Sequence, residues 1–193
     1  MNYSDDWLFE TYITKEEVKK IKKILSKTIV ENRIPNRIES KSTTGDIQQY
    51  SLHELLDSNI HDLIKFKTKE ILIENNILKE ENELNHKGSW TVYGQEGSYH
   101  VTHNHLRNTS DLNNFGSKFL PQISIVLYLD CPKSYSHSGL FYAFFRSNEI
   151  ILKEPEIGKL IIFPSWIYHG TYPQPKGLRH TLSIDFTLNA NLC

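Results

Sequence analysis

A series of short β-type segments, which fills the chain from Ser89 onward, is the feature that most constrains the fold. These segments are rich in Val, Ile, Thr, Tyr and Phe and are separated by turn-forming residues. In order they read SWTVYG, GSYHVTHNHL, QISIVLYLD, GLFYAFF, NEIILKE, GKLIIFPS and HTLSIDFTL. Because the strands follow two helical segments instead of alternating with them, they predict a sandwich or barrel backed by helices, not a βαβ fold.

The chain before this point is helical in pattern and highly charged. Thr14 and Glu17 form a capping-box signature ahead of an apolar stripe, and Ser51 and Glu54 form a second one. The polar segment 32–50 between them reads as a loop, and LFETYI, ahead of the first helix, reads as a strand. We therefore expect a single domain over residues 1–193, with helical support in 1–88 and a β core in 89–193.

Composition and charge exclude several classes of protein. The 193 residues suit one compact domain. The formal net charge is −1 and the sequence has no long basic patch, so nucleic-acid binding is not expected. No segment approaches the roughly 20 apolar residues that span a bilayer, so no membrane partner is expected. The two cysteines form neither a disulfide framework nor a zinc motif, and a reducing, cytoplasmic location follows as the expectation.

Three histidines form the main candidate site. His103 and His105 are separated by one residue, so both point to one side if their segment ends a strand, while His100 should point away. His169 follows FPSWIY, where Pro164 ends another strand. Any single one of the nine histidines is more typically a surface or packing residue. An H-x-H pair with a distal histidine in a β-rich half nevertheless predicts a metal site, because neutral imidazoles bind first-row metals and leave coordination positions free.

Arg179 adds a candidate anion site. It opens an alternating strand in which one face carries Arg179, Thr181, Ser183 and Asp185 and the other carries His180, Leu182, Ile184 and Phe186. A guanidinium that points inward needs an anionic partner, which it binds in a bidentate manner. A dicarboxylic cosubstrate would place one carboxylate on the metal and the other on this arginine.

These motifs carry a family resemblance. The chain resembles the Fe(II)/2-oxoglutarate-dependent dioxygenase superfamily, and within it the prolyl-hydroxylase-like oxygenases with an H-x-H…H motif. The matching stretches are GSYHVTHNH (97–105), GKLIIFPSWIYH (158–169) and RHTLSIDFTLN (179–189). The C-terminal half matches well and the N-terminal half loosely. The resemblance implies a mainly β fold with N-terminal α: a double-stranded β-helix (jelly-roll or cupin-like) core with supporting helices.

The resemblance also implies the cofactors Fe(II) and 2-oxoglutarate and a set of site residues. His103 and His169 match the two histidine ligands, and Arg179 with Thr181 and Tyr128 would hold the far carboxylate of 2-oxoglutarate. His105 stands where the wider superfamily has Asp or Glu. We expect all three histidines to bind the metal; the alternative is that His105 swings away and leaves an open position.

The implied activity is hydroxylation of an amino acid, a peptide side chain or a small metabolite, with release of succinate and CO2. Halogenation, desaturation and cyclisation stay open, because they diverge after a shared step. The polar insertion 107–121, a candidate lid, and the loop 32–49 are expected to select the substrate. The sequence carries no signal for the oligomeric state.

Two other functions remain open. A cupin-type metal dioxygenase or isomerase needs no 2-oxoglutarate, and Gly97, His103 and His105 satisfy its G-x5-H-x-H motif. The glutamate that cupins place shortly afterwards is missing, and Pro173 stands where their second motif has asparagine. Arg179 favours the 2-oxoglutarate enzyme over the cupin. The third possibility is a non-enzymatic β-domain that binds a small ligand or a protein and whose histidines only pack.

Overall fold

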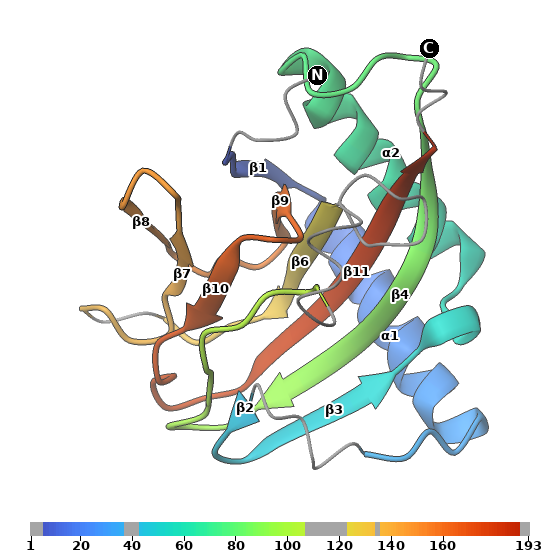
Figure 1. Ribbon diagram of the computed structural model, residues 1–193. Coiled ribbons are helices and arrows are strands. Elements are labelled where there is room, and N and C mark those ends of the chain that lie inside the picture. The colour runs from blue at the N-terminus through green and yellow to red at the C-terminus, as the bar shows by residue number, and fades with distance from the viewer. Residues whose placement is uncertain (1–5, 37–42, 107–122, 134–135, 190–193) are drawn as a thin grey trace.

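The computed structural model describes residues 6–36, 43–106, 123–133 and 136–189 (Figure 1). Within these ranges the chain forms two α-helices, one short 3-10 helix and eleven strands. In chain order they are β1 (Phe9–Tyr12), α1 (Lys15–Glu31), β2 (Thr43–Thr44), β3 (Ile47–Ser51), η1 (His53–Leu55), α2 (Ser58–Glu74), β4 (Glu83–Gly94), β5 (Tyr99–His100), β6 (Ile123–Asp130), β7 (Phe141–Phe144), β8 (Ile150–Lys153), β9 (Lys159–Pro164), β10 (Tyr168–Thr171) and β11 (Arg179–Asn189).

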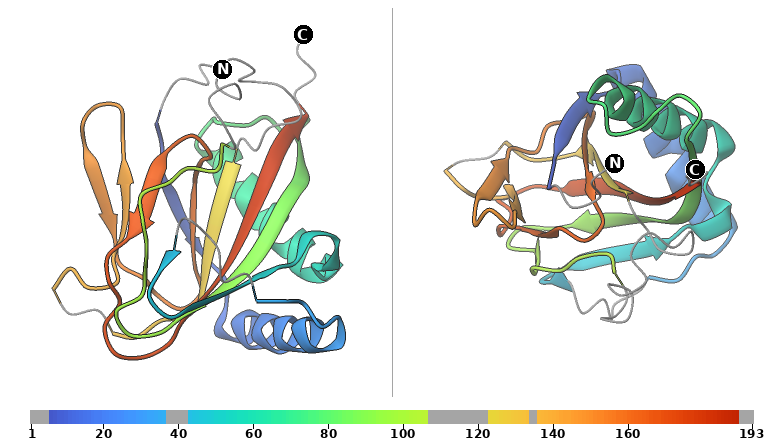
Figure 2. Two further views of the ribbon diagram at one scale, coloured as in Figure 1. Left: turned by 60° about the horizontal axis from the view of Figure 1, so that its bottom comes forward. Right: turned by 45° about the horizontal axis from the view of Figure 1, so that its top comes forward.

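The strands form antiparallel sheets of unequal size. The main sheet has the order β1-β9-β6-β11-β4-β3, and the smaller sheet has the order β10-β7-β8. β2 and β5 form a separate two-stranded sheet. Figure 2 shows α1 and α2 on one side of the main sheet and the smaller sheet on the other. The predicted fold, a mainly β jelly roll supported by helices, is confirmed.

The two faces of the main sheet have different partners because side chains alternate along each strand. On β11, Leu182, Ile184 and Phe186 belong to the core cluster that includes Ile21 and Ile64 of the helices. On the opposite face, Arg179, Thr181 and Ser183 line a cavity between the sheets. Burial of each large apolar side chain contributes about 1.5–3 kcal/mol, so the helix-facing cluster holds the sheet that carries the cavity.

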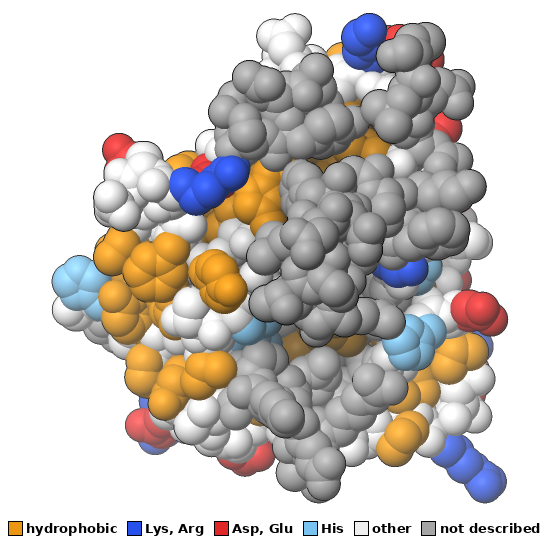
Figure 3. All heavy atoms as spheres, in the orientation of Figure 1, with side chains coloured by type: hydrophobic (Ala, Val, Ile, Leu, Met, Phe, Trp, Pro, Cys, Tyr) orange, Lys and Arg blue, Asp and Glu red, His pale blue; other side chains and the backbone are white. Residues whose placement is uncertain are grey.

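The outer face of the smaller sheet carries exposed hydrophobic side chains, which gather at the left of Figure 3. Phe144 pairs with Tyr168 of β10 and with Ile150 of β8, and all three side chains are exposed. Their alignment across three strands gives the small sheet cross-strand contacts on its outer side. In the described part of the chain, neither helix is both long and apolar enough to cross a membrane.

The two predicted helix starts have different outcomes. The Thr14–Glu17 capping box is present, and α1 buries Val18, Ile21 and Leu25. The Ser51–Glu54 prediction is wrong, because Ser51 is the last residue of β3 and pairs with Trp90. The second helix begins at Ser58, with the Asp57 carboxylate accepting hydrogen bonds from the Asn59 and Ile60 amides.

The main sheet draws strands from both sides of residue 88. β1 pairs with β9, β3 pairs with β4, and β4 begins at Glu83. The helical support predicted for 1–88 therefore also contains sheet strands, and part of the predicted loop 32–50 is strand. The predicted lid, 107–121, lies outside the described residues.

Candidate metal centre

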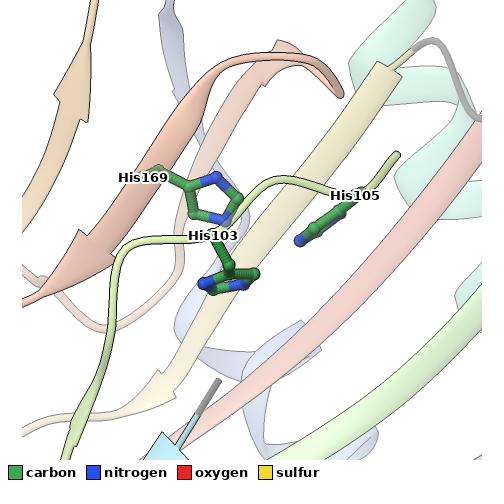
Figure 4. Close-up of side chains that lie close together, drawn as sticks. All are labelled: His103, His105 and His169. Carbon is green, nitrogen blue, oxygen red and sulfur yellow. The ribbon is translucent and has the colours of Figure 1, made fainter. Parts of the chain in front are cut away.

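The structure brings His103, His105 and His169 together, as the sequence predicted (Figure 4). His103 and His169 form an isolated antiparallel bridge, in which each amide donates to the carbonyl of the other at 2.9 and 2.8 Å. The His105 amide donates to the Ser165 carbonyl at 3.0 Å, which fixes the segment after β5 against the turn between β9 and β10. One ring nitrogen from each histidine lies within 4.8 Å of the others, and the cluster is large enough to hold a metal ion.

Each ring is oriented through its Nδ1 atom. Nδ1 of His103 lies 2.8 Å from the Val101 carbonyl, and Nδ1 of His169 lies 3.0 Å from the Ile167 carbonyl. Nδ1 of His105 lies 2.7 Å from Oδ1 of Asp185. Carbonyl and carboxylate oxygens accept hydrogen bonds, so the ring nitrogens donate. A neutral imidazole that donates through Nδ1 keeps its lone pair on Nε2, where a metal can take it.

The surroundings keep two of these imidazoles, those of His103 and His169, in the neutral form that binds metal. Burial, reinforced by the neighbouring His105, lowers the pKa of His103 to about 4. Burial and the same neighbour lower the pKa of His169 well below its usual range. Both rings are therefore neutral near pH 7, as metal ligation requires. Three imidazoles with no fourth protein donor among the described residues fit a first-row divalent metal with open positions.

The cavity beside the cluster also contains a charged group, Arg179. Its residue is 3% exposed, and neither Nη1 nor Nη2 has a hydrogen-bond partner in the described part of the chain. Oη of Tyr128 is also buried without a partner there. Burial lowers the pKa of Arg179, and burial raises the pKa of Tyr128 to about 12 although Arg179 opposes that shift. Buried donors of this kind fit an anion that accepts from both.

All the residues predicted to hold a metal or cosubstrate border this one cavity. The lining includes the three histidines together with Tyr128, Arg179 and Thr181. Its apolar walls include Trp90, Val126 and Phe141. The histidine cluster and the buried guanidinium of Arg179 therefore face the same cavity.

One prediction about the histidines is wrong. His100 lines the cavity instead of pointing away from it, and its ring centroid lies 5.9 Å from that of His103. β5 ends at His100 and the chain continues irregularly, so strand parity does not extend from His100 to His103. Burial lowers the pKa of His100 well below its usual range, which makes it a neutral group beside the cluster.

Sequence reasoning did not assign a role to Asp185 or Ser124. Both contact the His105 ring: Oδ1 of Asp185 and Oγ of Ser124 each lie 2.7 Å from Nδ1. Alternation along β11 had placed Asp185 on the face of Arg179, which was a usable signal. Nothing in the pattern linked that face to His105.

Comparison with known proteins gives structural but not sequence matches. Neither a known family model nor a curated protein matches the sequence. Among solved structures, a Pseudomonas putida prolyl-4-hydroxylase superposes with a TM-score of 0.66 at 15% identity, over 93% of this chain and 91% of that one. HygX from Streptomyces hygroscopicus, with nickel and 2-oxoglutarate bound, gives 0.64 at 11% identity, over 96% and 84%. The 2-oxoglutarate-dependent carbocyclase SnoK from nogalamycin biosynthesis gives 0.68 at 8% identity, over 96% and 81%.

These superpositions cover nearly the whole of the chain. The protein therefore has the fold of the 2-oxoglutarate- and iron(II)-dependent oxygenases.

Proposed function

We propose that the protein is an iron(II)- and 2-oxoglutarate-dependent oxygenase that hydroxylates an amino acid, a peptide side chain or a small metabolite. The observation that carries this proposal is the buried Arg179 guanidinium in the cavity of the histidine cluster, whose Nη1 and Nη2 have no hydrogen-bond partner among the described residues. A buried cation without an anion costs several kcal/mol, so the cavity favours a ligand that brings a carboxylate. A cupin-type reaction without a dicarboxylate gives this cation no partner.

The residues have distinct roles in this proposal. His103, His105 and His169 would hold the iron, and Arg179, Tyr128 and Thr181 would hold the far carboxylate of 2-oxoglutarate. Bound iron would supply the oxygen activation, with 2-oxoglutarate converted to succinate and CO2. Trp90, Val126 and Phe141 give the cavity apolar walls, and apolar surroundings strengthen the interaction between a guanidinium and its anion.

The structural neighbours support both classes of substrate. One neighbour is a Trichoplax adhaerens prolyl hydroxylase in complex with a peptide fragment, and another is HygX in complex with hygromycin B. We therefore keep peptides and small molecules as candidate substrates. We also propose a reducing, cytoplasmic setting, which suits the free thiol of Cys131, whose pKa burial raises to about 11.

An anaerobic titration tests the proposal directly. The protein is loaded with Fe(II), its metal content is measured, and 2-oxoglutarate is added while the visible absorption is recorded. Chelation of iron by the keto acid is expected to give a metal-to-ligand charge-transfer band that saturates at one equivalent. Iron-loaded protein that gives no such band would contradict the proposal, and oxygen consumption in the complete absence of 2-oxoglutarate would select the cupin-type reaction.

A further inference from the structure

The three histidines differ in what supports them. His103 and His169 donate to backbone carbonyls two residues earlier in the chain. His105 instead contacts a carboxylate, Asp185, across 2.7 Å, and the two side chains are only 7% and 9% exposed. A buried carboxylate is costly unless it is paired and hydrogen-bonded, so its place behind one ligand position is specific.

Asp185 is itself held by a hydroxyl network. Ser124 of β6 pairs with Asp185 of β11 in the sheet register, and its hydroxyl donates to Oδ1 at 2.7 Å. The Ser124 hydroxyl also lies 2.8 Å from that of Ser165, whose carbonyl accepts from the His105 amide. Three separate elements thus fix the carboxylate and the imidazole relative to each other.

The hydrogen-bonded Asp185 brings a negative charge close to a cluster whose metal-binding groups carry none. Among the described residues, the groups that converge on the metal position are imidazoles only. A divalent ion bound there would have no anion from the described part of the chain in direct contact. A carboxylate that accepts from Nδ1 fixes the tautomer, makes Nε2 a better donor and places a negative charge one hydrogen bond from the metal.

We propose that Asp185 is a positioning residue that acts through His105 and supplies the negative charge that the three histidines lack. The inference rests on the proposed metal site and deepens it. The competing arrangement is a purely structural contact between His105 and Asp185, in which His105 takes no part in metal binding. The two arrangements differ in whether Asp185 and His105 affect metal affinity together.

Calorimetric titration with Co(II), together with the visible absorption spectrum of bound Co(II), tests this without substrate or turnover. Asp185→Asn is expected to weaken metal binding by roughly 10–100-fold, the usual effect of losing a carboxylate behind a histidine ligand. In a His105→Ala background the same substitution is expected to change the affinity little. Asp62→Asn is a matched control, because Asp62 contacts Nδ1 of His61 at 3.0 Å on the surface of α2; it should leave the affinity unchanged.

The outcomes separate the two levels of the proposal. Wild-type protein that binds no metal overturns the metal site and the role of Asp185 together. Wild-type protein that binds Co(II) while Asp185→Asn binds it equally well overturns the role of Asp185 alone. So does an effect of Asp185→Asn that persists undiminished without His105. If Asp185→Asn fails to fold, Ser124→Ala, which removes the donor to Asp185, should still weaken binding by roughly threefold to tenfold.

Discussion

Arg179 and Lys159 are both buried cations, but they have opposite surroundings. Lys159 is 4% exposed and contacts the carboxylates of Glu10 and Glu156, whose hydrogen bonds raise its pKa despite burial. Arg179 is 3% exposed and has no carboxylate partner in the described chain. Lys159 is therefore neutralised by two carboxylates, whereas Arg179, which lines the cavity, has no such partner among the described residues.

This contrast predicts opposite effects of one substitution on stability and binding. Arg179→Met removes an unpaired buried charge, so the free energy of unfolding of the metal-free protein should stay equal or rise by about 1 kcal/mol. Binding of 2-oxoglutarate to the iron-loaded protein should weaken by roughly 30-fold or more, because a buried charged contact is lost. Denaturant unfolding and the charge-transfer titration measure the two quantities.

Tyr128→Phe is the matched control, since it removes one neutral donor from the same carboxylate position. Tyr128→Phe should weaken the binding of 2-oxoglutarate by roughly tenfold, which is a smaller effect than that of Arg179→Met. An Arg179→Met protein that binds 2-oxoglutarate like the wild type would show that the anion lies elsewhere.

For individual residues, the sequence predicted which face a side chain lies on better than it predicted which side chain it contacts. Alternation correctly placed Arg179 and Thr181 on the cavity face. His103 and His105 do lie together, but on an irregular segment after β5 and not on the strand end that the prediction assumed. The contact between His105 and Asp185 joins residues 80 positions apart, and the Ser124 hydroxyl that donates to Asp185 is opposite it through the register between β6 and β11. Periodicity within one strand carries no information about that register.

Among the elements, β10 carries His169 and depends on a glycine for its close approach to its neighbours. A Cβ on Gly170 would lie 2.7 Å from the carbonyl oxygen of His100 and would also collide with the Tyr142 hydroxyl. The backbone carbonyl cannot move away as a flexible side chain can. Gly170 therefore sets the distance between β10 and the segment that leads to His103.

Gly170→Ala is expected to displace β10 and with it the His169 ring. The overpacking should cost about 1–3 kcal/mol of unfolding free energy and weaken Co(II) binding in the same protein. Gly88→Ala provides the control, because a Cβ there meets no atom within 4 Å. Equal metal affinities for the two alanine variants would show that β10 can shift without moving His169.

The two predicted capping boxes show how tertiary structure decides whether a local helix-start signature forms a helix. Thr14 lies between β1 and α1, so its side chain is free to cap the helix, and the predicted capping box forms. Ser51 carries the same signature, but its backbone is committed to the ladder with β4. The sheet pairing outweighs a cap worth about 1 kcal/mol, and the helix starts after the strand has ended.

For the molecule as a whole, folding places neutral histidines on both faces of the main sheet. His180 lies on the helix-facing side, stacked on Tyr93 at 4.0 Å and hydrogen-bonded to the Thr91 hydroxyl at 2.8 Å. Burial, with a contribution from Lys22, lowers the pKa of His180 to about 4. Burial also lowers the pKa of His86 and His103. The unfolded chain therefore binds more protons than the folded one at mildly acidic pH.

The metal-free protein should accordingly lose stability as the pH falls from about 6.5 toward 4, and be most stable above that window. His180 alone should contribute on the order of 1–3 kcal/mol to this loss. Denaturant unfolding at pH 7.5, 6 and 5 measures the slope, and His180→Gln should reduce it. Thr91→Val should lower stability at every pH while keeping the slope, and identical slopes for wild type and His180→Gln would refute the assignment.

The alternation of β11 restricts how this protein can evolve. Arg179 lines the cavity and Asp185 contacts His105 from the same strand, and both positions depend on odd-numbered residues facing away from the helices. A codon gained or lost between them would turn one end of the site toward the helices and bring apolar side chains into the cavity. Point substitution leaves the faces intact. Descendants of this gene can therefore retune the site one residue at a time, but we expect the length of this strand segment to stay fixed.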